Sequence, residues 1–302
     1  MAKEKFNVKE AITKEIIESL EANKTIWHKD WKCMGVPSSA NSGKAYRGIN
    51  FLILSLKQMA KGYKSSKWVT YKNCLKLGGE VTKGEKSTMV TFYSPYEIID
   101  KETGDKKKIP LLKYYSVFNI EQTSLKDDDR FIDVMNDLDS NMRNEELELV
   151  LDNYDCKIEH AIQDKACYYP TLDKILMPMV EQFDSYHAYY STRIHEMAHS
   201  TGHKDRLNRF EDIEKLNSKK ENYAIEELVA EITSMFMLAT YNIDNEAIKD
   251  NNKAYIAGWL KALKSDPDYI FKASRYAQKA FDFITNKTFD NAEAEEKELA
   301  TV

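Results

Sequence analysis

Hydrophobic residues recur every three or four positions in several stretches of this 302-residue chain, which places them on one face of an α-helix. In the first half, this spacing predicts helices over residues 8–22, 49–61 and 71–78. Two further stretches, 87–99 and 111–119, have the composition of strands, and the turn-forming segment 100–105 between them predicts a β-hairpin. We therefore expect an α+β fold in this half of the chain.

The second half predicts mainly helices. Around residues 186–200, several tyrosines together with Ile194, Met197 and Ala198 form a largely apolar helix. Residues 223–236 form an amphipathic helix whose core-facing side chains are Ile225, Leu228, Val229, Ile232, Met235 and Phe236. The first of these helices also carries a carboxylate and two imidazoles, and such groups need a partner that offsets the cost of their burial.

These three groups belong to His195-Glu196-Met197-Ala198-His199, which is a zinc-site motif. Because residues four apart lie on one face of a helix, His195 and His199 can both turn a ring nitrogen toward one metal ion. Glu196 can reach a water molecule at that ion, where a general base is needed. The apolar neighbours disfavour the alternative, a surface helix with two incidental histidines. We therefore predict one Zn²⁺ per chain, with Glu196 as the catalytic base.

Zinc needs a third protein ligand, and the chain offers two candidates. Asp205 lies ten residues after His195, which matches the spacing of metzincin-like sites. Glu227 lies on the second apolar helix with Glu231 four residues later, which resembles the thermolysin-like arrangement of a ligand glutamate and an acidic residue that orients a ligand histidine. We favour Glu227 as the ligand and Glu231 as the orienting residue. Glu226 points about 100° away on the helical wheel, so we do not expect it to be a ligand.

The net charge of −5 hides a division along the chain. Residues 1–125 contain 22 Lys and Arg against 13 Asp and Glu, a net charge of +9, whereas residues 126–302 contain 22 against 36, a net charge of −14. This division suggests that the first half binds a polyanion. Residues 126–144 are acidic and polar, and we expect a linker there between a domain at 1–125 and a domain at 145–289. The acidic residues 290–302 are expected to form a disordered tail.

The basic first half is also rich in aromatic residues. Aromatic rings stack on unpaired bases while Lys and Arg follow the phosphates, so this combination is typical of single-stranded nucleic-acid binding. The loops 39–48 and 82–86 add Gly, Asn and Lys, and their backbone amides can approach phosphates closely. The candidate contacts with single-stranded DNA are Trp27, Trp31, Asn41, Lys44, Tyr46, Arg47, Asn50, Trp68, Lys83 and Lys86. Because aromatic residues are also common in cores, Trp27 and Trp68 could be core residues instead.

The sequence also gives expectations about location. No apolar run is long enough to span a bilayer, and the N-terminus lacks the apolar segment of a signal peptide. The four cysteines have neither C-x-x-C nor disulfide-framework spacing, so we expect them to be reduced. We therefore expect a cytoplasmic protein without a membrane partner.

Many separate stretches of the chain match one known family in the family's own order. In the first half they are Trp27-His-Lys-Asp-Trp31, the run from Ser42 to Asn50, Trp68-Val-Thr-Tyr71, Gly78-Gly79, Lys83-Gly-Glu-Lys86 and the run from Tyr115 to Gln122. In the second half they are Tyr169-Pro170, Asp173-Lys-Ile175, Met177-Pro178, Tyr189-Tyr190 and the run from His195 to Arg209. Through these stretches, which cover residues 10–285, the chain resembles the ArdC-like antirestriction proteins of plasmids and phages.

The resemblance implies an N-terminal domain that binds single-stranded DNA, followed by a mainly helical zincin-like metallopeptidase domain with a small sheet. It implies an antirestriction protein that coats incoming DNA, for example during conjugation, and whose zincin domain cleaves a host or plasmid protein. Members of the family often carry a small residue at the position of Asp205, which further favours Glu227. In one alternative the zincin domain is structural or recruits a partner, without peptidase turnover. In another, disfavoured by the aromatic residues, the basic half of a processing protease recognises acidic proteins.

Overall fold

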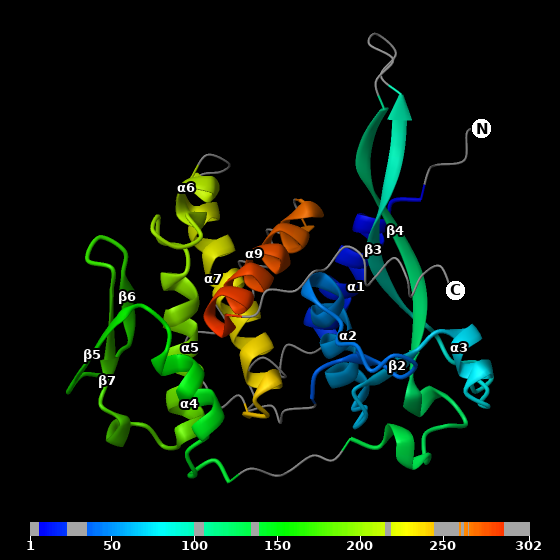
Figure 1. The fold of residues 1–302 in the computed structure, drawn as a ribbon, viewed down its shortest axis with the longest axis horizontal. Coiled ribbons are helices and arrows are strands. Elements are labelled where there is room, and N and C mark those ends of the chain that lie inside the picture. The colour runs from blue at the N-terminus through cyan, green and yellow to red at the C-terminus, as the bar shows by residue number, and fades with distance from the viewer. Residues whose placement is uncertain are drawn as a thin grey trace.

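The structure, a computed structural model, describes residues 6–22, 35–99, 106–133, 139–214, 219–244, 260, 263–264 and 266–286. One sheet lies toward each end of the molecule, and helices lie between the two sheets (Figure 1). The first part of the chain combines helices with one sheet, and the second part is mainly helical with a small sheet, which confirms the predicted fold class. Trp27, Trp31 and the predicted turn at 100–105 lie outside the described residues.

The first sheet has four strands in the order β1-β2-β4-β3. Their bounds are β1 (Ser38–Ser39), β2 (Lys67–Val69), β3 (Thr88–Ile99) and β4 (Lys106–Asn119). β1 and β2 are parallel, and the other two pairs are antiparallel. β3 and β4 form the predicted hairpin, but β4 begins at Lys106 rather than at residue 111, and its first residue pairs with Ile99. The hydrophobicity pattern missed this extension because the hairpin projects from the body, where strand positions need not be apolar (Figure 1).

Three helices accompany this sheet: α1 (Val8–Ala22), α2 (Gly48–Lys61) and α3 (Tyr71–Lys76). α2 ends where predicted, because Gly62 adopts a left-handed conformation with φ of 68°. α3 ends two residues earlier than predicted, since Gly78, with φ of 88°, cannot continue a right-handed helix. Thr70 caps the start of α3 by accepting a hydrogen bond from the backbone N–H of Asn73 at 3.2 Å.

The second part begins with α4 (Glu145–Asp152) and a three-stranded sheet in the order β5-β7-β6. The strands are β5 (Lys157–Ala161), β6 (Cys167–Tyr169) and β7 (Lys174–Pro178), with β6 antiparallel to β7 at one edge. Among the described residues, the α-helices that follow include α5 (Tyr186–Ser200), α6 (Arg209–Glu214), α7 (Lys219–Thr240) and α9 (Asp268–Thr285). None of the described helices combines the length and apolar character needed to cross a membrane.

One hydrophobic core joins the two parts of the chain. Ile12 of α1 and Phe51 of α2 belong to the same buried cluster as residues of α5, α7 and α9. The Phe51 ring packs edge-on against Phe236 of α7, with 4.5 Å between ring centroids, and Phe236 packs in turn against Phe281 of α9 at 6.2 Å. α1 and α2 therefore cover helices of the second part.

Polar contacts reinforce this packing. Arg47, at the start of α2, forms an ion pair with Asp282 of α9 at 2.6 Å, and the backbone N–H of Gly48 donates to Gln278 at 2.7 Å. The segment predicted as a linker also contributes: Phe131 is buried in a small core beside the first sheet, and Asp133 pairs with Lys67 at 3.1 Å. The first residues of that segment therefore pack against the N-terminal part.

We predict that Phe51→Ala lowers the free energy of unfolding by about 3–5 kcal/mol, because it removes a buried ring from the shared core. Both parts should unfold in one transition, so urea curves followed by tryptophan fluorescence and by circular dichroism should coincide for wild type and variant. The matched control, Leu75→Ala on the exposed side of α3, should change the stability by no more than about 0.5 kcal/mol. Two separate transitions would show that the parts are independently stable.

Candidate metal centre

α5 brings His195 and His199 together, one turn apart. The helix begins at Ser185, whose side chain accepts a hydrogen bond from the backbone N–H of Ala188 at 3.0 Å. Its apolar side, which includes Ile194 and Met197, is fully buried against the core. The Nε2 atoms of the two histidines consequently lie 3.1 Å apart and point the same way.

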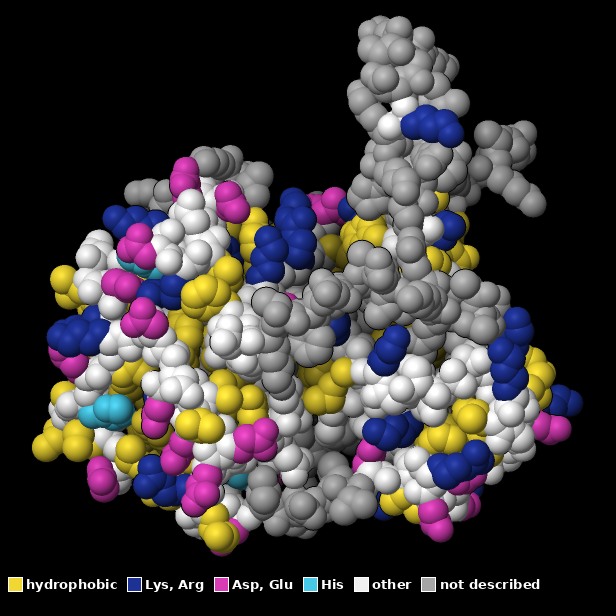
Figure 2. All heavy atoms as spheres, in the orientation of Figure 1, with side chains coloured by type: hydrophobic (Ala, Val, Ile, Leu, Met, Phe, Trp, Pro, Cys, Tyr) yellow, Lys and Arg dark blue, Asp and Glu magenta, His cyan; other side chains and the backbone are white. Residues whose placement is uncertain are grey.

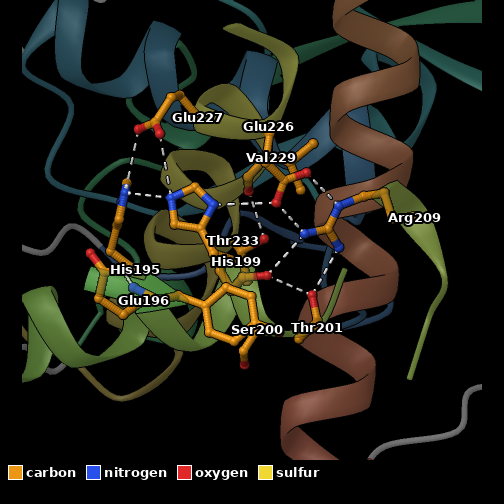
Figure 3. A network of polar contacts seen from close by, with 12 residues as sticks. His195, Glu196, His199, Ser200, Thr201, Arg209, Glu226, Glu227, Val229 and Thr233 are labelled. Carbon is orange, nitrogen blue, oxygen red and sulfur yellow. Dashed lines mark hydrogen bonds and ion pairs between the residues drawn. The ribbon is translucent and has the colours of Figure 1, made fainter. Parts of the chain in front are cut away.

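Glu227 on α7 faces this pair of histidines (Figure 3). Its two carboxylate oxygens lie 3.6 Å from Nε2 of His195 and 3.6 Å from Nε2 of His199. One ligand atom from each of the three residues falls within 4.8 Å of the others, so the trio could hold a metal ion. Two imidazoles and one carboxylate form the His₂Glu donor set that suits zinc, with further positions open to water or substrate.

The electrostatics of the trio also fit a cation. Burial disfavours the charged form of His195, but the hydrogen bond to Glu227 and the charges of Glu231 and Glu196 outweigh burial and raise the pKa of His195 to about 9. Glu227 is buried as well, yet the two histidines lower its pKa. The pocket therefore favours positive charge between these side chains, which a proton or a metal ion can supply.

A carboxylate lies near Nδ1 of each histidine of the trio. Glu231 approaches Nδ1 of His195 at 3.6 Å, on the other side of the ring from the Nε2 that faces Glu227. Glu226 approaches Nδ1 of His199 at 3.3 Å. Glu226 was expected not to be a ligand, and it lies outside the trio, but its contact with His199 was not foreseen. A carboxylate at Nδ1 fixes the tautomer of an imidazole, so that Nε2 presents its lone pair to a metal.

Arg209, at the start of α6, is the partner of Glu226. The guanidinium is almost completely buried and donates to both Glu226 oxygens, at 2.9 and 2.6 Å. It also donates to the Thr201 hydroxyl at 2.8 Å and to the backbone carbonyl of Ala198 at 3.0 Å (Figure 3). Burial alone would raise the pKa of Glu226, but Arg209 outweighs burial and the pKa is about 2. Arg209 therefore links the end of α5 to α7 and keeps Glu226 ionised.

Glu196, the predicted base, points toward the edge of the second sheet. One of its carboxylate oxygens accepts a hydrogen bond from the backbone N–H of Tyr168 on β6 at 2.7 Å. Its negative charge is one of the causes of the raised pKa of His195. The edge strand thus fixes the direction of this side chain, an interaction that the sequence pattern did not predict.

Asp205, the alternative third ligand, lies elsewhere. Its side chain is 71% exposed and approaches Nδ1 of His203 at 3.5 Å. The chain turns sharply after α5, with Leu207 donating its backbone N–H to the carbonyl of Thr201 and the ring of Phe210 packed so closely on Gly202 that an added Cβ would meet it at 2.5 Å. This turn carries Asp205 to the surface, so the geometry favours Glu227 over the metzincin-like alternative.

The candidate DNA contacts fall into different environments. Trp68 is fully buried, and Asn50 is buried with its side chain bonded to the backbone of Thr91 at 2.6 and 2.8 Å. Tyr46 is half-buried beside the Trp68 cluster, and Arg47 is paired with Asp282 as described above. In this conformation these four side chains have structural partners. The exposed candidates lie on loops and are Asn41, Lys44, Lys83 and Lys86.

Comparison with known proteins identifies both parts of the chain. Residues 6–118 match the N-terminal domain of the anti-restriction factor ArdC, and residues 145–276 match a zincin-like metallopeptidase domain. The metal-free crystal structure of the antirestriction ArdC protein from plasmid R388 is similar, with 38% sequence identity, a TM-score of 0.77, and coverage of 93% of this chain and 97% of that chain.

The chain belongs to the ArdC family. The Mn(II)-bound structure of the same R388 protein matches with 37% identity and a TM-score of 0.74, covering 93% of this chain and 98% of that one. An uncharacterised protein, y4eC, of Sinorhizobium fredii (strain NBRC 101917 / NGR234) is 32% identical over 92% of this chain and 91% of its own length.

The family also has longer relatives. One DNA primase TraC of Escherichia coli is 34% identical over 94% of this chain, and a second is 32% identical over 91% of it. The chain spans only 27% and 20% of the lengths of these two primases. The ArdC-like region therefore occurs both in proteins of this size and as a part of larger ones.

We predict that the protein binds one zinc-class ion through the trio. His195→Ala, His199→Ala and Glu227→Ala should each lose most of the metal, because each removes one of three donor groups. Inductively coupled plasma mass spectrometry of the purified full-length variants measures this loss. The control Asp205→Ala should retain the metal. If Asp205→Ala lost the metal and Glu227→Ala retained it, the result would show that Asp205 is the third ligand, as in metzincin-like sites.

A second prediction concerns Arg209. Arg209→Met should lower the free energy of unfolding by about 3–5 kcal/mol, because it leaves the Glu226 carboxylate buried without its partner. Adding Glu226→Gln should recover part of this loss. Urea denaturation in the presence of a chelator measures the effect without a contribution from metal binding. Arg275→Met, at an exposed position of α9, is the matched control and should change the stability by no more than about 0.5 kcal/mol.

Proposed function

We propose that this ArdC-family protein is an antirestriction protein of a plasmid or phage, which binds incoming single-stranded DNA in the cytoplasm and carries a zinc metallopeptidase site. The observation that supports the proposal most directly is the combination of both ArdC regions in one chain with the His195, His199 and Glu227 trio. The antirestriction role rests on the similarity to the R388 protein, and the two biochemical activities rest on the separate arguments below.

The case for DNA binding rests on charge and on exposed lysines. Residues 1–125 carry a net charge of +9, and Lys44, Lys83 and Lys86 extend from loops on the surface of this part. On the face shown in Figure 2, Asp and Glu side chains gather over the second part of the chain instead. A polyanion would therefore be attracted to the N-terminal part and repelled by the other.

The case for peptidase chemistry rests on the surroundings of the trio. An ion held by His195, His199 and Glu227 would act as a Lewis acid on a carbonyl oxygen and would lower the pKa of a bound water to about 7. Glu196 would accept the proton of the attacking water and return it to the leaving amine. The Tyr168 N–H fixes the direction of the Glu196 carboxylate before substrate enters. The substrate class is a peptide bond of a host or plasmid protein.

The two activities can be separated by substitution. Glu196→Gln keeps the size and hydrogen bonding of the side chain but removes the base, so metal content and DNA binding should be retained while hydrolysis stops. Replacing both Lys83 and Lys86 by Glu should weaken DNA binding, because each lysine lost from a phosphate contact reduces affinity and its salt dependence. Fluorescence anisotropy and metal analysis establish these properties before any assay in cells.

We predict that protection depends more on DNA binding than on hydrolysis. In a conjugation assay with a restricting recipient, the double lysine variant should lose protection, whereas Glu196→Gln should keep most of it. The opposite order would show that proteolysis carries the antirestriction function. Retained protection by Glu196→Gln, with no cleavage of cellular proteins by the wild type, would indicate that the zincin domain is structural or recruits a partner.

A further inference from the structure

The β3–β4 hairpin forms an arm that extends beyond the rest of the molecule (Figure 1). β4 pairs with β2 only through Phe118 and Asn119, so the remainder of the two strands pair only with each other. A two-stranded ribbon of this length has both faces and its outer edges available, unless another element covers them. At the base of the arm, α1 and α2 pack against part of the ribbon. Farther out, Tyr93 and Tyr114 are exposed to solvent.

The register places these two tyrosines on one face of the arm. Tyr93 lies opposite Leu112 and Tyr114 lies opposite Thr91, so the tyrosines are diagonal neighbours on the same side of the ribbon. Both are strongly exposed, Tyr93 to 55% and Tyr114 to 46%. Diagonal neighbours lie about 7–8 Å apart, within the range at which two rings can contact one ligand.

A third aromatic ring, from near the N-terminus of the chain, lies beside one of these two tyrosines. Phe6, just before α1, packs against Tyr114 with 5.4 Å between ring centroids and remains 56% exposed. Exposed rings are common one at a time, but three at one place form an apolar surface that usually has a partner. We call Phe6, Tyr93 and Tyr114 the arm aromatic cluster.

Positive charge continues along the same ribbon. β4 contains four lysines and β3 one acidic residue, Glu97, which pairs with Lys108 in the register; Lys106 is exposed at the outer end of β4. Because side chains alternate along a strand, Lys106 lies on the same face as Tyr114, eight residues away. This separation is about 27 Å, a length over which several nucleotides can extend.

We propose that the arm aromatic cluster is a stacking site for single-stranded DNA, whose bases lie on Tyr93 and Tyr114 while its phosphates extend toward Lys106. The inference rests on the proposed DNA-binding function and specifies the surface that performs it. Aromatic rings beside cations are the combination that holds unpaired bases without sequence preference. A duplex keeps its base faces stacked internally, so the cluster discriminates in favour of single strands.

The test uses the full-length protein and fluorescein-labelled oligothymidylate. Tyr93→Ala and Tyr114→Ala should each weaken binding by about 5- to 150-fold, the range that corresponds to the loss of one stacked base. Tyr93→Phe and Tyr114→Phe should bind as the wild type does, because they keep the ring. Both positions are exposed, so the Ala variants should keep the melting temperature of the wild type. Tyr169→Ala, an exposed tyrosine on β6, is the matched control and should not affect binding.

Three outcomes would overturn the inference. If the wild type binds oligothymidylate and both Ala variants bind equally well, DNA lies on another surface and only the stacking site is refuted. If the Ala variants lose affinity for duplex and single strand to the same extent, the arm contacts phosphates and does not stack on bases. If the wild type does not bind oligothymidylate at all, the proposed DNA-binding function fails together with the stacking site.

Discussion

The contact between α5 and α7 depends on how the charges buried between these helices are balanced. Glu226, Glu227 and Glu231 of α7 all face the two histidines of α5, and the only guanidinium that the described contacts bring to these glutamates is that of Arg209. With neutral imidazoles, these three carboxylates and the guanidinium sum to −2, and Glu196, whose charge also acts on His195, adds a further negative charge. A divalent cation in the trio would offset most of this charge; without it, water would have to enter or protons would have to bind. The same arrangement that could hold a metal therefore also determines how stably the two helices pack.

Arg209 and the carboxylates at Nδ1 explain how the histidines keep their directions. Each imidazole has a glutamate carboxylate near Nδ1, and one of these glutamates is held in turn by a buried arginine that also donates to the backbone carbonyl of Ala198 near the end of α5. A positively charged side chain at a helix C-terminus interacts favourably with the helix dipole, so Arg209 stabilises α5 in addition to pairing with Glu226. The two histidines are thus oriented by a network of buried polar contacts as well as by their own rotamer preferences.

The shared core gives the two ArdC regions a common structural element. α7 carries both Glu227 and, nine residues later, Phe236, which packs against Phe51 of α2 in the N-terminal part. The candidate metal centre and the helices beneath the projecting arm are therefore parts of one packed body. The aromatic residues have different roles: Phe51 packs between the two parts, Trp68 fills a core within the N-terminal part, and Tyr93 and Tyr114 face the solvent.

Local spacing along the chain was enough to predict α1, α2, α3, α5 and α7, the hairpin and the pairing of His195 with His199, because each depends on residues only a few positions apart. Spacing could not choose between Glu227 and Asp205, since both are compatible with a histidine pair until the turn after α5 carries Asp205 to the surface. It also could not show that Arg209 is buried beside Glu226, or that Trp68 lies in the core while Tyr93 is exposed. Burial and charge pairing depend on contacts between segments that are distant in the sequence. Only the tertiary structure therefore determines which of these side chains are buried and which are paired.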